Sequence, residues 1–193
     1  MANFPPSGEQ SGFPYQCFIK FRIPSDERFH ALSRAFDVLK QEKQKILEEL
    51  AHDADEEDDE EVDRRVEEKK RKEDAIANTL FDLFDEQALS HFWWPSQQDW
   101  EAYLRRWNST PIPQRFTDPT FDHPWDFSSM VDSLLSGEYA FVSCHLLESN
   151  VGVLIYLIDS WPYGSSDAIK ALIEAFDGEM LGADLGTGYV AYN

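Results

Sequence analysis

The side chains of this chain that are best suited to proton transfer or metal binding are its histidines. There are five, and they stand singly in the sequence: His30, His52, His91, His123 and His145. None falls into a zinc-type or metalloprotease-type spacing with a cysteine, a glutamate or another histidine. Single histidines are most often surface residues, and we therefore expect no metal site and no cofactor.

Two of these histidines have neighbours that could give them a role. Asp122 and His123 lie in a proline-rich stretch near other aspartates, where a base or a metal ligand could be assembled. His145 follows Cys144 in an expected strand, and their side chains must point to opposite faces, so they cannot form a thiolate–imidazole pair. The turn after the next expected strand is a second place where function could collect. An alternative small-ligand site would thus combine Asp122, His123, His145, Asp159, Trp161 and Tyr163.

The glycines of the GADLGTG sequence superficially suggest a phosphate-binding loop. Such a loop needs the N-terminus of a helix directly after it, whereas the five residues that follow have the pattern of a strand. We interpret Gly182, Gly186 and Gly188 as a turn and the entry to a strand. The sequence has no nucleophile elbow, Walker A motif or dinucleotide fingerprint, and we name no catalytic residue.

The most strongly charged segment is an acidic run at residues 53–61, with eight carboxylates and one alanine. A calcium loop needs ordered ligand spacing and a glycine at its sharp turn, and the run has neither. We expect a solvated loop at the tip of a helical hairpin. Partner docking is the second interpretation, and it would use Glu56, Glu57, Asp58 and Asp59.

The segment at residues 90–127 is rich in tryptophan and proline. Tryptophan is enriched at the binding hot spots of proteins, which makes Trp93, Trp94, Trp100 and Trp107 candidates for partner contacts. Aromatic rings on a proline-rich segment are also typical of a cover over an open sheet face. The cover is our first expectation and the exposed recognition surface our second.

Composition sets further bounds on this chain of 193 residues, of which 42% are hydrophobic and 14% aromatic. That content suffices for a core, and no apolar run is long enough for a membrane span. The formal net charge of −20 disfavours nucleic acid and anionic membranes as partners and favours a basic or neutral protein surface. The N-terminal residues lack the features of a secretory signal, and the two cysteines fit reduced core positions, so we expect a cytoplasmic protein.

Hydrophobic periodicity predicts a strand at residues 15–23, which alternates cleanly, and a helix at residues 26–50. The helix carries a heptad seam with one polar interruption, at Lys43. A second helix is expected at residues 62–89, and the two should form an antiparallel hairpin whose distal half is marginal. A short helix is expected at residues 97–107, irregular chain at residues 108–125, and a further helix at residues 126–135.

The last third of the chain predicts strands at residues 139–147 and 151–159, a helix at residues 166–177 and a final strand at residues 188–192. The resulting order, β-α-insertion-β-β-α-β, resembles the ferredoxin-like fold, an α+β arrangement with an antiparallel sheet. The resemblance covers roughly residues 15–50 and 137–193 and implies no function. We expect a flexible tail at residues 1–14 and one domain at residues 15–193, with an insertion at residues 51–136.

Three hypotheses of function follow from the sequence. The first is a non-catalytic, acidic, cytoplasmic protein-binding module, such as an inhibitor, an immunity-type protein or an adaptor. The second is a small enzyme or ligand-binding protein with its site near the loop at residues 108–125 and the turn at residues 159–163. The third is a homodimer formed through the helical hairpin, because heptad seams can pair between chains.

Overall fold

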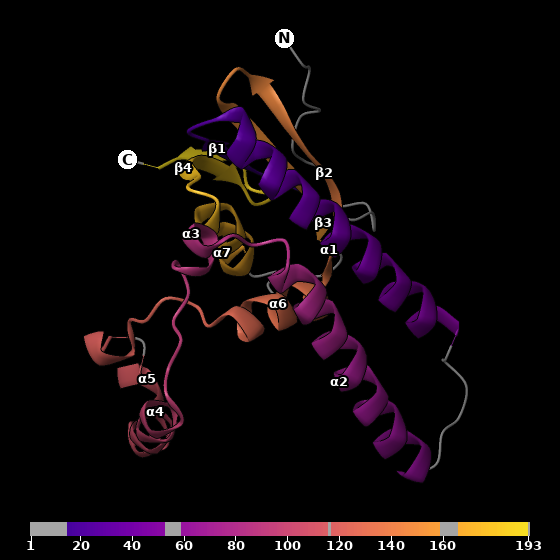
Figure 1. The fold of residues 1–193 in the computed structure, drawn as a ribbon, viewed down its shortest axis with the longest axis vertical. Helices are drawn as coiled ribbons and strands as arrows, with labels where there is room; N and C mark the ends of the chain where they lie inside the picture. The colour runs from indigo at the N-terminus through magenta and orange to yellow at the C-terminus, as the bar shows by residue number, and fades with distance from the viewer. Residues whose placement is uncertain (1–14, 53–58, 116, 159–165, 193) are drawn as a thin grey trace.

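The computed structural model describes residues 15–52, 59–115, 117–158 and 166–192. Within them the chain forms an α+β fold around a five-stranded sheet in the order β2-β3-β1-β4-β5, with every neighbouring pair antiparallel. The strands are β1 (Tyr15–Arg22), β2 (Tyr139–Glu148), β3 (Val151–Ile158), β4 (Glu179–Asp184) and β5 (Tyr189–Ala191). Figure 1 shows this sheet together with the helices.

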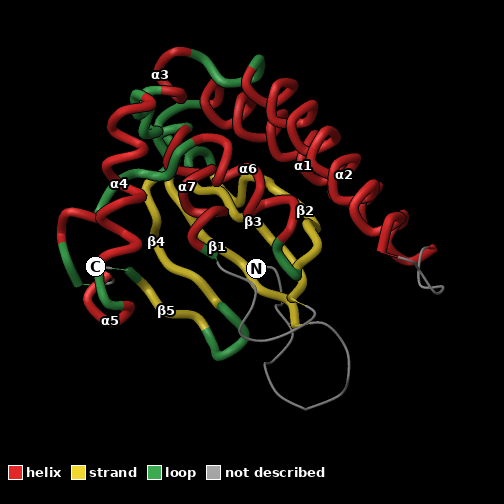
Figure 2. Tube along the Cα trace, turned by 90° about the horizontal axis from the view of Figure 1, so that it is seen from below, coloured by secondary structure: helices red, strands yellow, loops and turns green. Residues whose placement is uncertain are grey.

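The helices of the described residues are grouped at one side of the sheet and beyond its edges (Figure 2). They are α1 (Asp26–His52), α2 (Asp59–Phe81), α3 (Glu86–Leu89), α4 (Gln97–Ser109), α5 (Ile112–Arg115), the 3-10 helix η1 (Pro119–Phe121), α6 (Phe127–Ser136) and α7 (Asp167–Ala175). Helix α1 packs against β2 and α7 against β4, while α6 contacts α1, α2 and α7.

The first strand has the alternation that the sequence predicts. Cys17, Ile19, Phe21 and Ile23 are buried in the core, since every second side chain of a strand points to the same face. The neighbouring strand β3 places Gly152 directly opposite Phe21. A Cβ atom at that glycine would lie 2.5 Å from the phenylalanine ring, so the absence of a side chain makes room for the ring.

The C-terminal prediction of one strand, at residues 188–192, was incomplete. Two strands follow α7, and β4 is the one that pairs with β1, whereas β5 pairs only with β4. Sequence reading missed β4 because Gly182 lies inside it with a φ of +155° and the register shifts beside it, between Lys20 and Phe21. The side chain of Tyr189 approaches this glycine so closely that a Cβ atom there would lie 2.4 Å from the tyrosine hydroxyl oxygen.

The second predicted helix, at residues 62–89, is in fact two helices. Helix α2 ends at Phe81, and α3 starts after a turn in which Leu83 and Phe84 donate backbone hydrogen bonds three residues back. Asp85 then caps α3 by accepting a hydrogen bond of 2.8 Å from the backbone N–H of Ala88. An aspartate cap inside an otherwise helical pattern is a local signal that the periodicity of the larger side chains concealed.

Lys43 does not interrupt the packing of α1, as the sequence suggested, but completes it. Its side chain is 1% exposed, and its ammonium donates hydrogen bonds to the carbonyl oxygens of Leu134, Leu135 and Gly137 at 2.8, 3.0 and 2.6 Å. These carbonyls lie at the C-terminal end of α6, where helix carbonyls lack partners and the helix dipole favours a cation. The ammonium also lies 4.1 Å from the centroid of the Tyr139 ring.

Near the core, the two long helices pack as the seam predicts. Phe29, Leu32 and Phe36 of α1 belong to the same buried cluster as Ile76 and Leu80 of α2. Both helices then run away from the sheet (Figure 1). The predictions for residues 1–14 and for residues 53–58 of the acidic run lie outside the described residues. No helix of the described ranges combines the length and apolar composition that a membrane span requires.

Candidate functional site

A second projection leaves the core after α3 and returns at α6, on the side opposite the long helices (Figure 1). We call the described residues from 93 to 123 the aromatic arm. Its main element, α4, begins at an N-cap in which Ser96 Oγ accepts a hydrogen bond from the backbone N–H of Asp99. None of the residues of α4 is buried, which sets this helix apart from the core helices.

Three aromatic rings form a ladder along one side of α4. Trp100, Tyr103 and Trp107 are three and four residues apart, so they share a helix face. The centroids of neighbouring rings are 5.5 and 5.9 Å apart, and their planes differ by only 16° and 24°. This offset stacking stabilises an aromatic pair by about 0.5–1.5 kcal/mol beyond the area it buries.

Rings from outside α4 close the ladder into a small core. Phe121 of η1 packs edge-on against Tyr103 and Trp107, at 5.7 and 5.2 Å. The imidazole of His123 stacks on Trp93 with a centroid distance of 4.7 Å and an angle of 8° between the planes. The arm therefore has a small aromatic core of its own, separate from the core beneath the sheet.

The carboxylates near His123 are used as helix caps. Asp118 accepts hydrogen bonds from the backbone N–H and the hydroxyl of Thr120, and these bonds hold the pKa of its carboxyl below the usual range. Asp126 accepts from the backbone N–H of Ser129 at the start of α6. The aspartates that might have oriented a histidine base thus stabilise local backbone, and the imidazole packs against an indole.

Two arginines of the arm lie over aromatic rings at one end of the ladder. The guanidinium of Arg115 lies 5.0 Å from the Trp107 ring, and that of Arg106 lies 5.9 Å from the Phe121 ring. Arg115 is also held by a hydrogen bond of 2.8 Å from its Nε to the carbonyl oxygen of Thr110. The Trp107 end of the ladder is therefore already occupied by a cation of the chain itself.

The outer surface of the arm and its root exposes large apolar side chains. The exposed fraction is 54% for Trp94, 37% for Trp100, 38% for Leu104 and 64% for Ile112. Scattered exposed apolar residues are ordinary in soluble proteins, whereas four large ones on one short projection give it an apolar surface. Such surfaces are typical of protein–protein contacts.

The arm joins the core through Trp93 and Trp94. The backbone N–H of Trp93 donates to the carbonyl oxygen of Trp125 at 2.9 Å, and Trp94 Nε1 donates to the carbonyl oxygen of Leu89 at 2.8 Å. The Trp94 ring packs against Phe81 and Phe127, both at a centroid distance of 6.1 Å. These contacts attach the arm to the helices, and no ring contact described for it reaches a strand.

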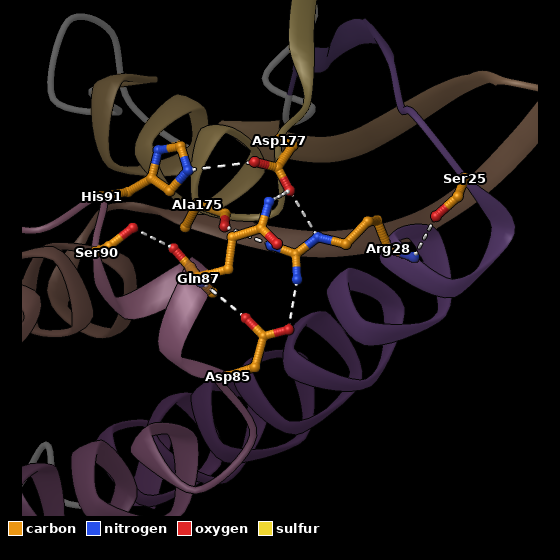
Figure 3. A network of polar contacts seen from close by, with 9 residues as sticks. Ser25, Arg28, Asp85, Gln87, Ser90, His91, Ala175 and Asp177 are labelled. Atoms are coloured by element: carbon orange, nitrogen blue, oxygen red, sulfur yellow. Dashed lines mark hydrogen bonds and ion pairs between the residues drawn. The ribbon is translucent and has the colours of Figure 1, made fainter.

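A polar network lies just before the arm and connects three helices (Figure 3). Arg28 of α1 is 11% exposed and forms ion pairs with Asp85 at 2.6 Å and with Asp177 at 2.8 Å. It also donates to the carbonyl oxygen of Ala175 at 3.0 Å, at the C-terminal end of α7. Gln87 and His91 reach the same Asp177 carboxylate, at 2.9 and 3.4 Å. Helix α1, helix α3 and the C-terminal end of α7 are thus tied together just before the arm.

Asp177 has an unusual backbone conformation for a residue other than glycine, with a φ of +61°. It follows α7 at the position where a left-handed residue ends a helix, and Gly178 donates to the carbonyl oxygen of Ile173 at 3.0 Å. Glycine usually stands at this position because a side chain there costs of order 1 kcal/mol. The carboxylate, which gathers Arg28, Gln87 and His91, gives a physical reason for aspartate here.

A hollow of about 330 Å³ lies between α1 and β2, and its lining includes Lys40, Lys43, Leu47 and Phe141. The Lys40 ammonium donates to the carbonyl oxygen of Val142 at 2.6 Å, at a bulge of β2, and Lys43 is bonded as described above. Both ammonium groups therefore support the backbone. None of the residues that sequence analysis singled out as a site lies in this hollow.

The sequence-based candidates fall into separate parts of the molecule. The four tryptophans lie together on the arm and its root, with a centroid distance of 5.8 Å between Trp93 and Trp100. His123 is in the same cluster beside the exposed Asp122, whereas His145 is on the edge strand β2 at the other side of the molecule (Figures 1 and 2). The other seven candidates are outside the described residues or have undescribed side chains: Glu56, Glu57, Asp58, Asp159, Trp161, Tyr163 and, in α2, Asp59.

The two thiols offer no activated nucleophile. Cys17 and Cys144 are free, and β3 lies between their strands. Burial raises the pKa of Cys17 to about 11 and that of Cys144 to about 12, so both are thiols at neutral pH. Within the described residues no group of three histidine, cysteine, aspartate or glutamate side chains could hold a metal ion.

Sequence reading did not single out Phe121 or Arg115, and it treated Lys43 only as a polar interruption of the seam. Phe121 and Arg115 contact the ladder because the chain folds back on α4. Periodicity in the sequence does not predict a contact of this kind. Lys43 did carry a signal, because a lysine at a core position of a heptad seam must find buried acceptors.

The comparisons with known proteins return no relative. No family model matches the chain, and neither a curated protein nor a solved structure is significantly similar to it.

Proposed function

We propose that this chain is a non-catalytic protein-binding module of the cytoplasm and that the aromatic arm carries its contact surface. The observation that supports this best is the exposure of Trp94, Trp100, Leu104 and Ile112 on a projection that packs its remaining rings internally. Large, rigid aromatic side chains lose little conformational entropy on binding and dominate many interfaces. An inhibitor, an immunity-type protein or an adaptor would use such a surface.

The charge of the chain supports a partner with a basic or neutral surface. Eleven acidic residues and no lysine or arginine lie between positions 48 and 63, a stretch of sequence that includes the end of α1 and the start of α2. They supply more than half of the net charge of −20. A charge concentrated in this way accelerates encounter with a basic partner and makes affinity depend on salt. It also disfavours nucleic acid and anionic membranes as partners.

We infer that the sheet is ferredoxin-like, with β1, α1, β2, β3, α7 and β4 as its six elements. The order β2-β3-β1-β4 and the antiparallel pairing support this interpretation. Strand β5 and the segment between α1 and β2 would then be additions. The segment that includes the arm is one of these additions, which suits a functional element placed on a common scaffold.

The enzyme alternative has less support. His123 stacks on Trp93, and neither Asp122 nor His145 is brought into contact with it by any interaction that the structure describes. The homodimer hypothesis relied on the seam of α1, whose positions Leu32, Phe36 and Leu39 are at most 1% exposed within the chain itself. A second copy could therefore not reach that part of the seam without unfolding the core.

The test uses two double variants that change the charge by the same amount. Leu104→Asp with Ile112→Asp places charges on the exposed arm surface, while Gln41→Asp with Asn78→Asp places them on exposed positions of the long helices. The immobilised wild-type chain captures partners at 0.15 M salt, and each captured protein is identified, purified and titrated by calorimetry. Additional aspartates do not repel a basic partner. Loss of binding in the arm variant would therefore mean that apolar contacts have been lost.

We expect the arm variant to bind its partner at least tenfold more weakly, and the control variant to change the affinity less than twofold. Affinity of the wild type should fall as salt rises from 0.05 to 0.3 M. Equal effects of the two variants, or a partner whose affinity ignores salt, would reject the proposed surface and partner class.

A further inference from the structure

We propose that residues 1–14 lie across the face of the sheet that no described helix covers, and that they shield its apolar side chains from water. These residues precede β1 and are outside the described part of the chain, and sequence analysis predicts a flexible tail there. The support comes from the side chains of the uncovered face and from the length, position and composition of the segment. The aromatic arm has no part in this arrangement, which is therefore independent of the proposed function.

The strand register identifies the side chains of the uncovered face. Ile19 of β1 and its register partner Leu154 of β3 belong to the core cluster, which includes residues of the helices. Since successive side chains of a strand point to opposite faces, the next residues along both strands point away from the helices. Tyr189 of β5 shares this second face, because its ring stacks on that of Phe18 at a centroid distance of 5.9 Å. We call the following residues the helix-free face: Phe18, Val151, Val153, Ile155, Leu157 and Tyr189.

Strand β3 has the sequence of a strand that is covered on both faces. Its residues, VGVLIYLI, include no charged side chain, and the four that belong to the helix-free face are all aliphatic. A strand of an antiparallel sheet with one solvated face normally alternates apolar and polar residues instead. Val153 is in addition only 1% exposed, although it does not belong to the core cluster. The described helices lie on one side of the sheet and beyond its edges (Figure 2), so the helix-free face requires a cover of another kind.

Residues 1–14 start from the right place to supply this cover. They join the described chain at Tyr15, the first residue of β1, and β1 is the middle strand of the sheet. This strand has eight residues and is about 26 Å long. Fourteen extended residues reach up to roughly 46–50 Å. The segment is therefore long enough to cross the whole helix-free face from its point of attachment.

The composition of residues 1–14 suits contact with an apolar surface. Glu9 is their only charged side chain, whereas 28% of the residues of the whole chain are charged. Phe4, Phe13 and three prolines supply apolar area that gains from burial. A tethered segment also has an effective concentration on the order of millimolar at a site within its reach, so that modest contacts suffice.

Charge disfavours the two other kinds of occupant. Lys20 and Arg22 lie on the same side of β1 as the helix-free face, with Arg22 paired to Glu179, so this face does not attract the basic partner that the acidic surface favours. A second copy would bring a further net charge of −20 toward the first. Residues 1–14 bring a single carboxylate, that of Glu9, to a face that carries Lys20.

Photochemical cross-linking locates the segment in the folded full-length chain. The photoreactive phenylalanine analogue p-benzoylphenylalanine replaces Phe4, the protein is irradiated, and the linked peptides are identified by mass spectrometry. We expect an intramolecular link to a peptide that contains residues of the helix-free face. The same analogue at Leu47, a 41% exposed position of α1, is the control and should give no link to this face.

Two double variants of the full-length chain test whether the rings of the segment provide the cover. Phe4→Ser with Phe13→Ser removes both rings. Asn3→Ser with Gln10→Ser is the matched control, because it changes the same segment without removing apolar area. Circular dichroism verifies that both variants are folded.

Hydroxyl-radical labelling, read by mass spectrometry, measures how far water reaches the helix-free face. We expect loss of both rings to raise the labelling rates of Phe18 and Leu157 at least threefold, and the control variant to change them less than 1.5-fold. Leu47 is the internal reference, and its labelling rate should be the same in all three proteins.

The absence of an intramolecular link to the helix-free face, or labelling rates that are equal in the two double variants, would overturn the proposal. A linked product of twice the chain mass would assign this face to a second copy and overturn it as well. If the variant without the two rings failed to fold, the cross-link alone would decide. None of these results bears on the proposed function, which is tested by partner binding to the arm.

Discussion

The two projections of this molecule are held in opposite ways. Helix α1 starts inside the main core, where Phe29, Leu32 and Phe36 are buried, and Lys43 ties its middle to the end of α6. Helix α4 buries no residue and depends on rings that pack against each other. A helix that grows out of a core can carry charge along its outer half, whereas a helix that buries no residue of its own must be held by rings packed around it.

This difference explains the aromatic content of the arm. A cluster formed by a few short elements has little interior, so each side chain must bury a large area to offset the conformational entropy of ordering the chain. Tryptophan and tyrosine bury about 150–250 Å² each, more than any aliphatic residue. The same rings that hold the arm together also reach its surface, and folding and recognition therefore use one set of side chains.

The largest effect on stability is expected when the hydrogen bonds that Lys43 of α1 donates to the end of α6 are removed. Lys43→Met keeps most of the side-chain volume but leaves three carbonyl oxygens without their donor. Because an unsatisfied buried acceptor and a lost charged hydrogen bond each cost on the order of 1–3 kcal/mol, we expect the free energy of unfolding to fall by roughly 3–5 kcal/mol. Urea unfolding followed by circular dichroism measures it.

Lys45→Met is the control for this variant, since Lys45 lies two residues further along α1, is exposed and pairs with Glu42. It should change stability by less than about 0.5 kcal/mol. If Lys43→Met cost as little as Lys45→Met, the long helix would be held by its apolar seam alone.

A dependence on pH sharpens the role of the same lysine. Burial lowers the pKa of Lys43 from 10.5 to about 8, so between pH 8 and 10.5 the unfolded chain binds a proton that the folded chain has released. Stability from this group therefore rises with pH through that window and is lost as pH falls through 8. The wild type should gain about 1–3 kcal/mol relative to Lys43→Met between pH 7.5 and 10.5.

Urea titrations of both proteins across this range provide the measurement. Tyrosine and cysteine ionisation affects both chains alike and cancels in the difference. A difference that stays constant would contradict a pKa lowered by burial, and one that moves in the other direction would mean that the three carbonyl oxygens stabilise the ammonium more than burial destabilises it.

The next effect concerns the point at which both projections meet. Asp177→Asn keeps a residue that tolerates the left-handed conformation, but removes the charge that Arg28 and His91 face. We expect a loss of about 1–2 kcal/mol, and faster hydrogen exchange in α3 and at the root of the arm than in α1. Glu174→Gln, an exposed position on α7, serves as the control. Uniform acceleration throughout the chain would mean that the network has no local role.

The smallest expected effect comes from the outer end of the long helices. Replacing residues 53–61 by a short glycine–serine turn should change the free energy of unfolding by less than about 1 kcal/mol, because loop length affects stability only weakly. Differential scanning calorimetry would detect a change in the midpoint. A lost cooperative transition would show that the acidic run is required for the fold.

Periodicity in the sequence predicted the elements whose side chains repeat regularly. The alternation of Cys17, Ile19 and Phe21 predicted β1, and the seam from Phe29 to Leu39 predicted α1 and its buried face. Residues whose role depends on a distant partner could not be predicted in this way. The acceptors of Lys43 lie 91–94 residues away in the sequence. Strand β4 forms by pairing with β1, which is also far from it in the sequence.

The candidate site follows the same division. That Trp100 and Trp107 share a face of one helix could be derived from their spacing. That His123 stacks on Trp93, and that Arg115 covers Trp107, depends on how the chain turns through its prolines. Spacing therefore predicts which side chains share an element, while contacts between elements required the structure.

The crowding of tryptophan into one projection gives the molecule a built-in optical reporter. Five of its six tryptophans lie between positions 93 and 125, so indole emission reports chiefly on the arm and its root, while far-ultraviolet dichroism is dominated by the long helices. In a strictly two-state protein the two signals change together. A spectral shift that comes before the loss of helix would mean that the arm separates from a core that is still folded.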